Sequence, residues 1–134
     1  MDNDKPSKQS NAEILENCSQ NNLKLLKTSV QYRERFLLYL KSGKASQNQA
    51  ELSHVLAEVE LSIAQMQAFQ THLEELNQLC LFIQRFNSSM QASEHDQKLF
   101  AKYSLLIDVN VEESKCLCES LMQRMQLIMQ LDII

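Results

Sequence analysis

Apolar side chains between residues 52 and 83 recur at steps of three and four positions, which places them on one face of a helix. Two successive steps of three around Met66 shift the phase of an otherwise regular heptad pattern. The pattern predicts one long helix over about 46–87 with a continuous apolar seam. Its members are Leu52, Leu56, Val59, Ile63, Met66, Phe69, Leu73, Leu76, Cys80 and Ile83.

A first helix is predicted over about 12–42. Ser10 or Asn11 can cap its start, and Gly43 provides a left-handed stop at its end. A capping-box pattern from Ser46 to Gln49 then opens the second helix. The first helix carries a stripe of Leu23, Leu26, Val30, Leu37 and Leu40, and a neighbouring stripe of Leu25, Tyr32, Phe36 and Tyr39.

A third helix is predicted over about 94–131, after a weakly helical stretch at 87–96 that forms either a turn or a kink. Ser93, followed by Asp96, is typical of a helix cap. One face carries Leu99, Tyr103, Leu106, Asn110, Leu117, Leu121, Met125 and Ile128, and Phe100, Ile107, Val111, Cys118 and Met122 widen it. The apolar end at 127–134 is expected to dock on a partner or to fold back on the second helix.

Composition narrows the fold class. The chain of 134 residues contains one Gly and one Pro, and no Asn-Gly or Asp-Gly pair. A sheet protein needs such turn residues often, so a β or α/β fold is excluded. We expect an all-α protein: a disordered tail at 1–11, then one domain at 12–134 whose three long helices form a hairpin or bundle with coiled-coil character.

Charge is distributed unevenly along the chain. Residues 1–50 carry a net charge of +3 and residues 51–134 carry −7, which gives the overall −4. The acidic second helix argues against a nucleic-acid or anionic-membrane surface. We expect charge matching between the basic first helix and either the second helix or a partner. The basic residues are Lys24, Lys27, Arg33, Arg35, Lys41 and Lys44.

Catalytic and metal-binding chemistry finds little support in the residue pattern. Cys116 and Cys118 are two positions apart, which on a helix turns their thiols away from each other, and no further ligands lie nearby. His54, His72 and His95 are far apart, and Cys80 falls on the apolar seam. No phosphate loop or nucleophile motif occurs. We therefore expect no catalytic residue, no cofactor and no metal site.

The sequence shows no apolar run of the ~20 residues that a membrane span requires, and its start is polar rather than signal-like. With four cysteines and no secretory signal, a soluble protein of a reducing compartment is expected, either cytoplasmic or nuclear.

These observations favour a non-enzymatic helical subunit that joins other helical proteins in a hetero-oligomer. The alternative is a self-contained three-helix bundle that presents a groove to a peptide or lipid. In its long helices and few connections, the chain is similar to small helical subunits of kinetochore, spindle or organelle-biogenesis complexes, and to cytoskeletal scaffolds. Asn110 is a candidate for fixing register. The expected partner-binding residues are Leu52, Leu56, Val59, Ile63, Met66, Phe69, Leu73, Leu76, Ile83, Leu117, Leu121 and Ile128.

Overall fold

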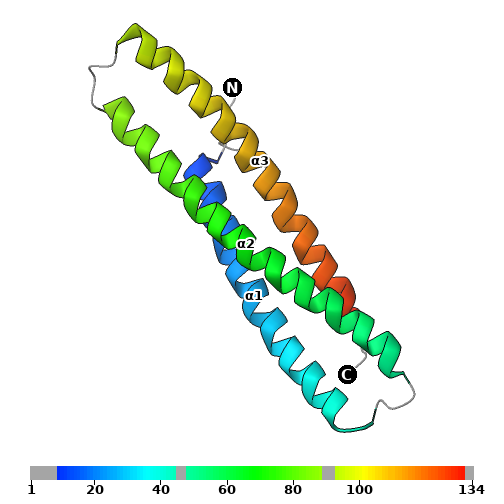
Figure 1. Ribbon diagram of the computed structural model, residues 1–134. Helices are drawn as coiled ribbons and strands as arrows, with labels where there is room; N and C mark the ends of the chain where they lie inside the picture. Colours follow the sequence, from blue (N-terminus) through cyan, green and yellow to red (C-terminus); the bar gives the residue numbers. More distant parts are fainter. Residues whose placement is uncertain (1–8, 45–47, 89–92, 132–134) are drawn as a thin grey trace, which may run out of the picture.

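The computed structural model describes residues 9–44, 48–88 and 93–131, and these form three helices: α1 (Asn11–Lys41), α2 (Gln49–Ser88) and α3 (Glu94–Gln130). Each helix runs antiparallel to the one before it and contacts both of the others, so the three build an elongated bundle (Figure 1). The predicted all-α class is confirmed. The tail predicted at 1–11 falls largely on residues 1–8, which lie outside the described residues, and the supercoiling of the helices stays a prediction.

The predicted helix caps are present at three of the helix ends. Ser10 Oγ accepts a hydrogen bond from the Glu13 amide at 3.2 Å, and Ser93 Oγ accepts one from the Asp96 amide at 3.2 Å. Gly43 has a φ of +75°, which favours glycine over any residue with a side chain. The capping box predicted to begin at Ser46 falls on residues 45–47, outside the described residues.

The break between the second and third helices is a chain reversal. α2 ends at Ser88, α3 begins at Glu94, and the two helices return side by side in opposite directions (Figure 1). A kink would have continued one helix in roughly the same direction. The connecting residues 89–92 lie outside the described part of the chain.

The bundle core consists of two adjoining clusters. The larger takes residues from all three helices and includes Leu15, Leu73 and Leu121. The smaller joins α1 to the start of α2 through Phe36 and Val59, and Ile128 and Met129 of α3 contact both clusters. Full burial of one such side chain stabilises the fold by roughly 1.5–3 kcal/mol.

The inward stripes of α1 and α3 differ in part from the predicted ones. On α1, Tyr32 and Phe36 of the neighbouring stripe are buried, whereas Leu23 is 49% exposed, Leu37 faces solvent, and Asn22 and Ser29 are buried instead. On α3 the inward stripe consists of Ile107, Val111, Ser114, Cys118, Leu121 and Met125. It takes Leu121 and Met125 from the predicted face and Ile107, Val111 and Cys118 from the residues predicted to widen it, while Leu99, Tyr103, Leu106 and Leu117 are exposed. The packing of the other two helices decides which of the neighbouring stripes is buried.

The α2–α3 hairpin extends beyond the first turn of α1 (Figure 1). The side chain of Asn11 donates to Asp108 Oδ1 at 2.6 Å, and a small cavity at this level is bounded by Asn11, Cys80 and Ile107. α1 therefore starts about two turns before the end of α2 and almost four turns after the start of α3. Over that length the two later helices contact each other without α1.

Candidate helix-binding groove

The apolar seam predicted on α2 lies inside the bundle. Val59 and Met66 are fully buried, and the other members are buried except Leu56, which is half-buried. Their contacts are with α1 and α3 of the same chain. The two flanking helices cover the seam because they fold antiparallel along nearly its whole length, so a partner reaches these residues only when the bundle opens.

The three predicted partner-binding residues of α3 separate into different environments. Leu121 is buried at 4% exposure and belongs to the core. Ile128 is half-buried against both core clusters. Leu117 is 46% exposed and lines a surface groove. Of the three, Leu117 is the one positioned to contact another molecule.

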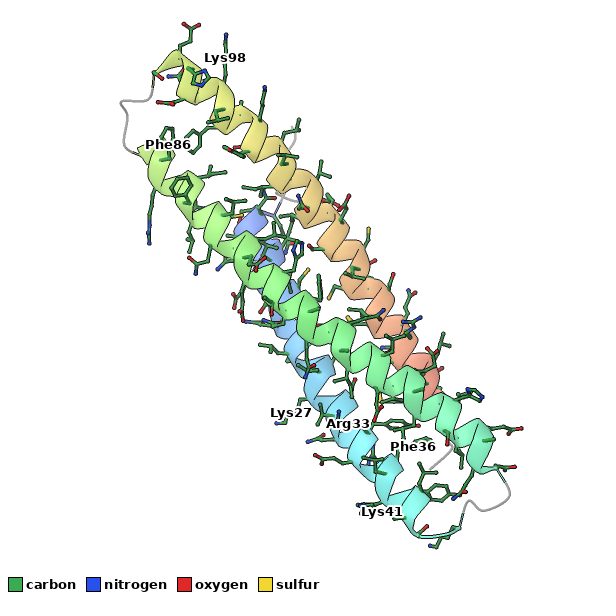
Figure 2. All side chains as sticks on the ribbon, viewed as in Figure 1. Lys27, Arg33, Phe36, Lys41, Phe86 and Lys98 are labelled. Atoms are coloured by element: carbon green, nitrogen blue, oxygen red, sulfur yellow. The ribbon has the colours of Figure 1, made fainter. Side chains whose placement is uncertain are left out.

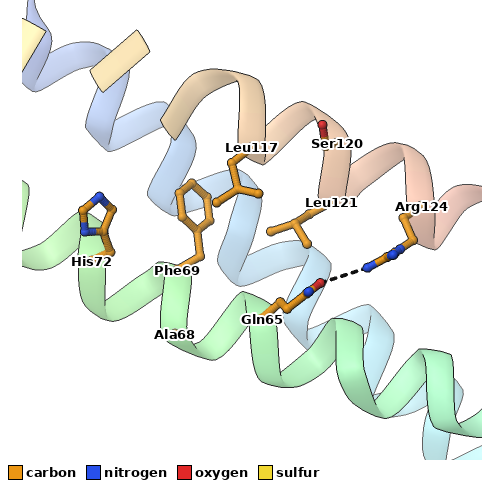
Figure 3. Close-up of a pocket in the computed structure, with 8 residues that line it drawn as sticks. All are labelled: Gln65, Ala68, Phe69, His72, Leu117, Ser120, Leu121 and Arg124. Carbon is orange, nitrogen blue, oxygen red and sulfur yellow. Dashed lines mark hydrogen bonds between the residues drawn. The ribbon is translucent and has the colours of Figure 1, made fainter. Parts of the chain in front are cut away.

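This groove, with a volume of about 610 Å³, runs between α2 and α3 and is lined by residues of these two helices alone. Figure 3 shows Phe69 and His72 on one wall and Leu117 and Leu121 on the other, with α1 lying behind. The helices are held together across the groove by a hydrogen bond from Arg124 Nη1 to Gln65 Oε1 at 3.0 Å (Figure 3).

Beyond the groove, the same faces of α2 and α3 carry a second, outward stripe in both directions. Gln65, Ala68 and His72 line the groove on α2, and positions three or four residues further along lie on the same face. On α3, the corresponding stripe extends in both directions from Leu117 and Arg124. The exposed apolar residues of the two outward stripes are Leu61, Leu79 and Phe82 on α2, and Leu99, Tyr103, Leu106, Leu117, Leu127 and Leu131 on α3.

Aromatic rings gather where the α2–α3 hairpin extends past α1. Phe86 and Phe100 stack with ring centroids 3.3 Å apart and planes 11° apart, and Figure 2 marks Phe86 at this end. Phe82 lies 6.1 Å from Phe100, and Tyr103 lies 6.4 Å from it with its ring edge-on. Exposed aromatic side chains of this kind often provide the main binding energy of a protein interface.

The register candidate Asn110 forms its hydrogen bond within its own helix, from Nδ2 to the Leu106 carbonyl at 2.8 Å. The buried interhelical amide is Asn22 on α1, which is 1% exposed. It donates to the Met66 carbonyl at 2.9 Å and to Gln70 Oε1 at 3.0 Å. Sequence reasoning missed Asn22, although its spacing of four residues from Cys18 and of seven from both Leu15 and Ser29 signals a core position.

The cysteines divide into three buried thiols and one exposed thiol, Cys116. Burial raises the pKa of Cys18 and Cys80, and it raises that of Cys118 from 9.0 to about 11. A raised pKa disfavours the thiolate, which is the reactive and metal-binding form. Within the described ranges no three His, Cys, Asp or Glu side chains come together in a way that could hold a metal ion.

The basic residues of α1 are directed to solvent. Lys27 and Lys41 lie along its outer side (Figure 2), and of the six predicted basic residues only Arg33 is half-buried. Arg35 lies over the Tyr32 ring at 5.8 Å from its centroid. The five glutamates of α2 between Glu51 and Glu75 are also exposed. Both charged faces are therefore accessible to another molecule.

None of the helical segments in the described part of the chain is long and apolar enough to cross a membrane. A search against known protein families, curated proteins and solved structures finds no match to this chain.

Proposed function

We propose that this chain is a non-enzymatic helical subunit or adaptor, which joins an intracellular multi-protein complex by accepting a helix of another subunit in its α2–α3 groove. The observation that carries the proposal is the second, outward apolar stripe on each of these two helices. The inward stripes already complete the core, so the outward stripes are not needed to fold the chain.

A fourth helix is the element that this groove fits. Two antiparallel helices with exposed residues at steps of three and four present the same surface that a four-helix bundle uses to receive its remaining helix. Contiguous apolar surface on a protein is a common sign of an interaction site. The setting we favour is a complex of the spindle, kinetochore or organelle-trafficking kind.

The alternative is a self-contained three-helix bundle that presents its groove to a peptide or lipid. The intramolecular burial of the α2 seam supports it, because the chain forms a core without a partner. The two functions differ in whether the isolated chain is stable. A purified chain that melts cooperatively as a monomer, at a temperature independent of concentration, favours the alternative. Aggregation or a concentration-dependent melt favours the obligate subunit.

Site-specific photocrosslinking in the native cell tests the groove directly. A photoreactive amino acid at Leu106, which is 57% exposed in the α3 outward stripe, should give a discrete adduct with a helical protein. The matched control places it at Gln31, which is exposed on α1. Equal adducts from the two positions, or none from Leu106, would contradict the proposal.

A further inference from the structure

The two outward stripes each carry a carboxylate near their middle, just beyond the end of the groove that His72 and Leu117 line. Glu75 follows the groove residue Ala68 by seven positions on α2, and Glu113 precedes the groove residue Ser120 by seven positions on α3. Residues seven apart on a helix lie on the same face. Both glutamates therefore belong to the outward stripes, and both are exposed.

The two glutamates also lie at the same level along the bundle. The hydrogen bond between Gln65 and Arg124 fixes which residues of the antiparallel helices face each other. Glu75 is ten residues beyond Gln65, and Glu113 is eleven residues before Arg124. Because every residue adds the same 1.5 Å rise, the two positions match to within about one residue.

These carboxylates make the centre of the surface between the two outward stripes acidic, while apolar residues lie towards both ends. Glu58 and Arg124 both line a neighbouring hollow, so their opposite charges offset each other there. The charge that remains on the stripes is that of Glu75 and Glu113. An occupant that carries a positive charge at its centre complements this surface.

We infer that the occupant is an amphipathic helix of a different protein, with a Lys or Arg near the middle of an otherwise apolar stripe. The inference rests on the proposed function and adds the chemistry of the partner. The outward stripe of α2 from Leu61 to Phe86 is ~38 Å long at 1.5 Å per residue, so it matches a helix of about 25 residues. Phe82 and Tyr103 offer an aromatic contact for one end of that helix.

A second copy of this chain fits less well. Two grooves facing each other around a two-fold axis near their centres would bring Glu75 and Glu113 of both copies together, and like charges oppose such pairing. Insertion of α1 from another copy would match in charge. However, each such pair would keep one unfilled groove and one free α1, and such a head-to-tail contact extends into a polymer.

Two synthetic helical peptides of 26 residues test the inference with the full chain. Both carry the same leucine stripe, and they differ only in having Lys or Glu at the two central positions that face the groove. Fluorescence anisotropy should show tighter binding of the lysine peptide by about tenfold at low salt, decreasing as salt is added. The double variant Glu75→Gln, Glu113→Gln should reduce this preference to about twofold or less.

The matched control is the double variant Glu74→Gln, Glu112→Gln. It removes the neighbouring glutamates, which lie outside the outward stripes, and should keep the preference; Glu74 instead lines a crevice between α1 and α2. A preference that both double variants lose equally would reflect overall charge and would overturn the inference. Equal binding of the two peptides would do the same.

The result also separates the inference from the proposed function. If both peptides bind equally and Leu106→Glu abolishes both, the groove accepts helices without selecting their charge, so the inference fails and the proposed function stands. If neither peptide binds, the inference fails and the crosslinking result decides the function. Sedimentation of the chain alone should show no discrete dimer, and a dimer that Leu106→Glu dissociates would overturn the assignment to a different protein.

Discussion

Asn22 of α1 donates a hydrogen bond to the main-chain carbonyl of Met66 in α2 at 2.9 Å, inside the bundle core. The same amide group also donates to Gln70, whose own amide donates to Ser19 Oγ at 2.7 Å. These bonds connect one position on α1 to one turn of α2. Sliding either helix by a residue would leave buried polar groups without partners, so this network specifies the register of the two helices.

Replacement of Asn22 by alanine should lower the free energy of unfolding by about 1–3 kcal/mol, because it removes two hydrogen bonds from a buried site. Asn110→Ala provides the control, since Asn110 is half-buried and bonds to its own helix. That variant should change the stability by no more than about 0.5 kcal/mol. Urea unfolding followed by circular dichroism measures both. Equal losses in the two variants would contradict a special role for Asn22.

Leu117 and Leu121 lie one helical turn apart, but their replacement by alanine should affect different properties, peptide binding for Leu117 and stability for Leu121. Leu121→Ala opens a cavity in the core and should destabilise the fold by about 2–5 kcal/mol. Leu117→Ala should leave stability within about 0.5 kcal/mol and weaken binding of the lysine peptide described above. Unfolding and anisotropy titrations together test the pair. A large loss of stability from Leu117→Ala would place this residue in the core rather than in the groove.

The four cysteines should react with a maleimide at very different rates. Cys116 is exposed and should be modified first, giving one adduct per folded chain. Cys18, Cys80 and Cys118 are buried with raised pKa values, so they should react only when the bundle opens. Mass spectrometry over time follows the adducts, and Cys116→Ser should remove the fast one. Rapid modification of a second site would show that the core is less closed than described.

Alkaline pH should destabilise the protein through Cys118. Its pKa is raised by burial from 9.0 to about 11 in the folded chain. Above pH 9 the unfolded chain loses the thiol proton while the folded chain keeps it, so stability that is fully present below pH 9 declines up to about pH 11. The slope reaches at most about 1.4 kcal/mol per pH unit for this one thiol. Urea unfolding across this range should show a smaller decline in Cys118→Ser, which also controls for the other titrating groups.

Ser62 is a site where a substitution should stabilise the protein. Its side chain is fully buried, and Oγ has no hydrogen-bond partner among the residues that the structure describes. Ser62→Ala removes this cost and should raise the free energy of unfolding by about 1 kcal/mol. Ser29 is equally buried but donates to the Leu25 carbonyl at 2.7 Å, so Ser29→Ala should give no gain. A thermal melt that fell for Ser62→Ala would indicate that the hydroxyl is satisfied.

The fold class and three caps could be predicted because they depend on local signals. Ser10, Gly43 and Ser93 act within one helical turn, and the scarcity of Gly and Pro applies to the whole chain. The inward face of α2 could also be predicted from the sequence, because one apolar stripe dominates that helix. Its interpretation as a partner surface stays a prediction, because α1 and α3 of the same chain cover it.

The inward faces of α1 and α3 could not be chosen from the pattern, because each helix carries two apolar stripes. On α3, Leu117 belongs to one stripe and Cys118 to the other, and only the packing of the other helices decides between them. On α1 the buried stripe includes Asn22 and Ser29, which apolar periodicity alone treats as surface. The groove depends on the same decision, since it consists of the stripes that the core did not use.

Because the bundle has three antiparallel helices, the chain enters and leaves it at different levels. The chain enters α1 beside Asp108 and leaves α3 after Gln130, so entry and exit lie roughly 33 Å apart along the bundle at 1.5 Å per residue. A hairpin of two helices would return its ends to one place. In this molecule the start of α1 and the end of α3 instead lie at different levels of the bundle, so segments attached at these two helix ends would leave it from separate places.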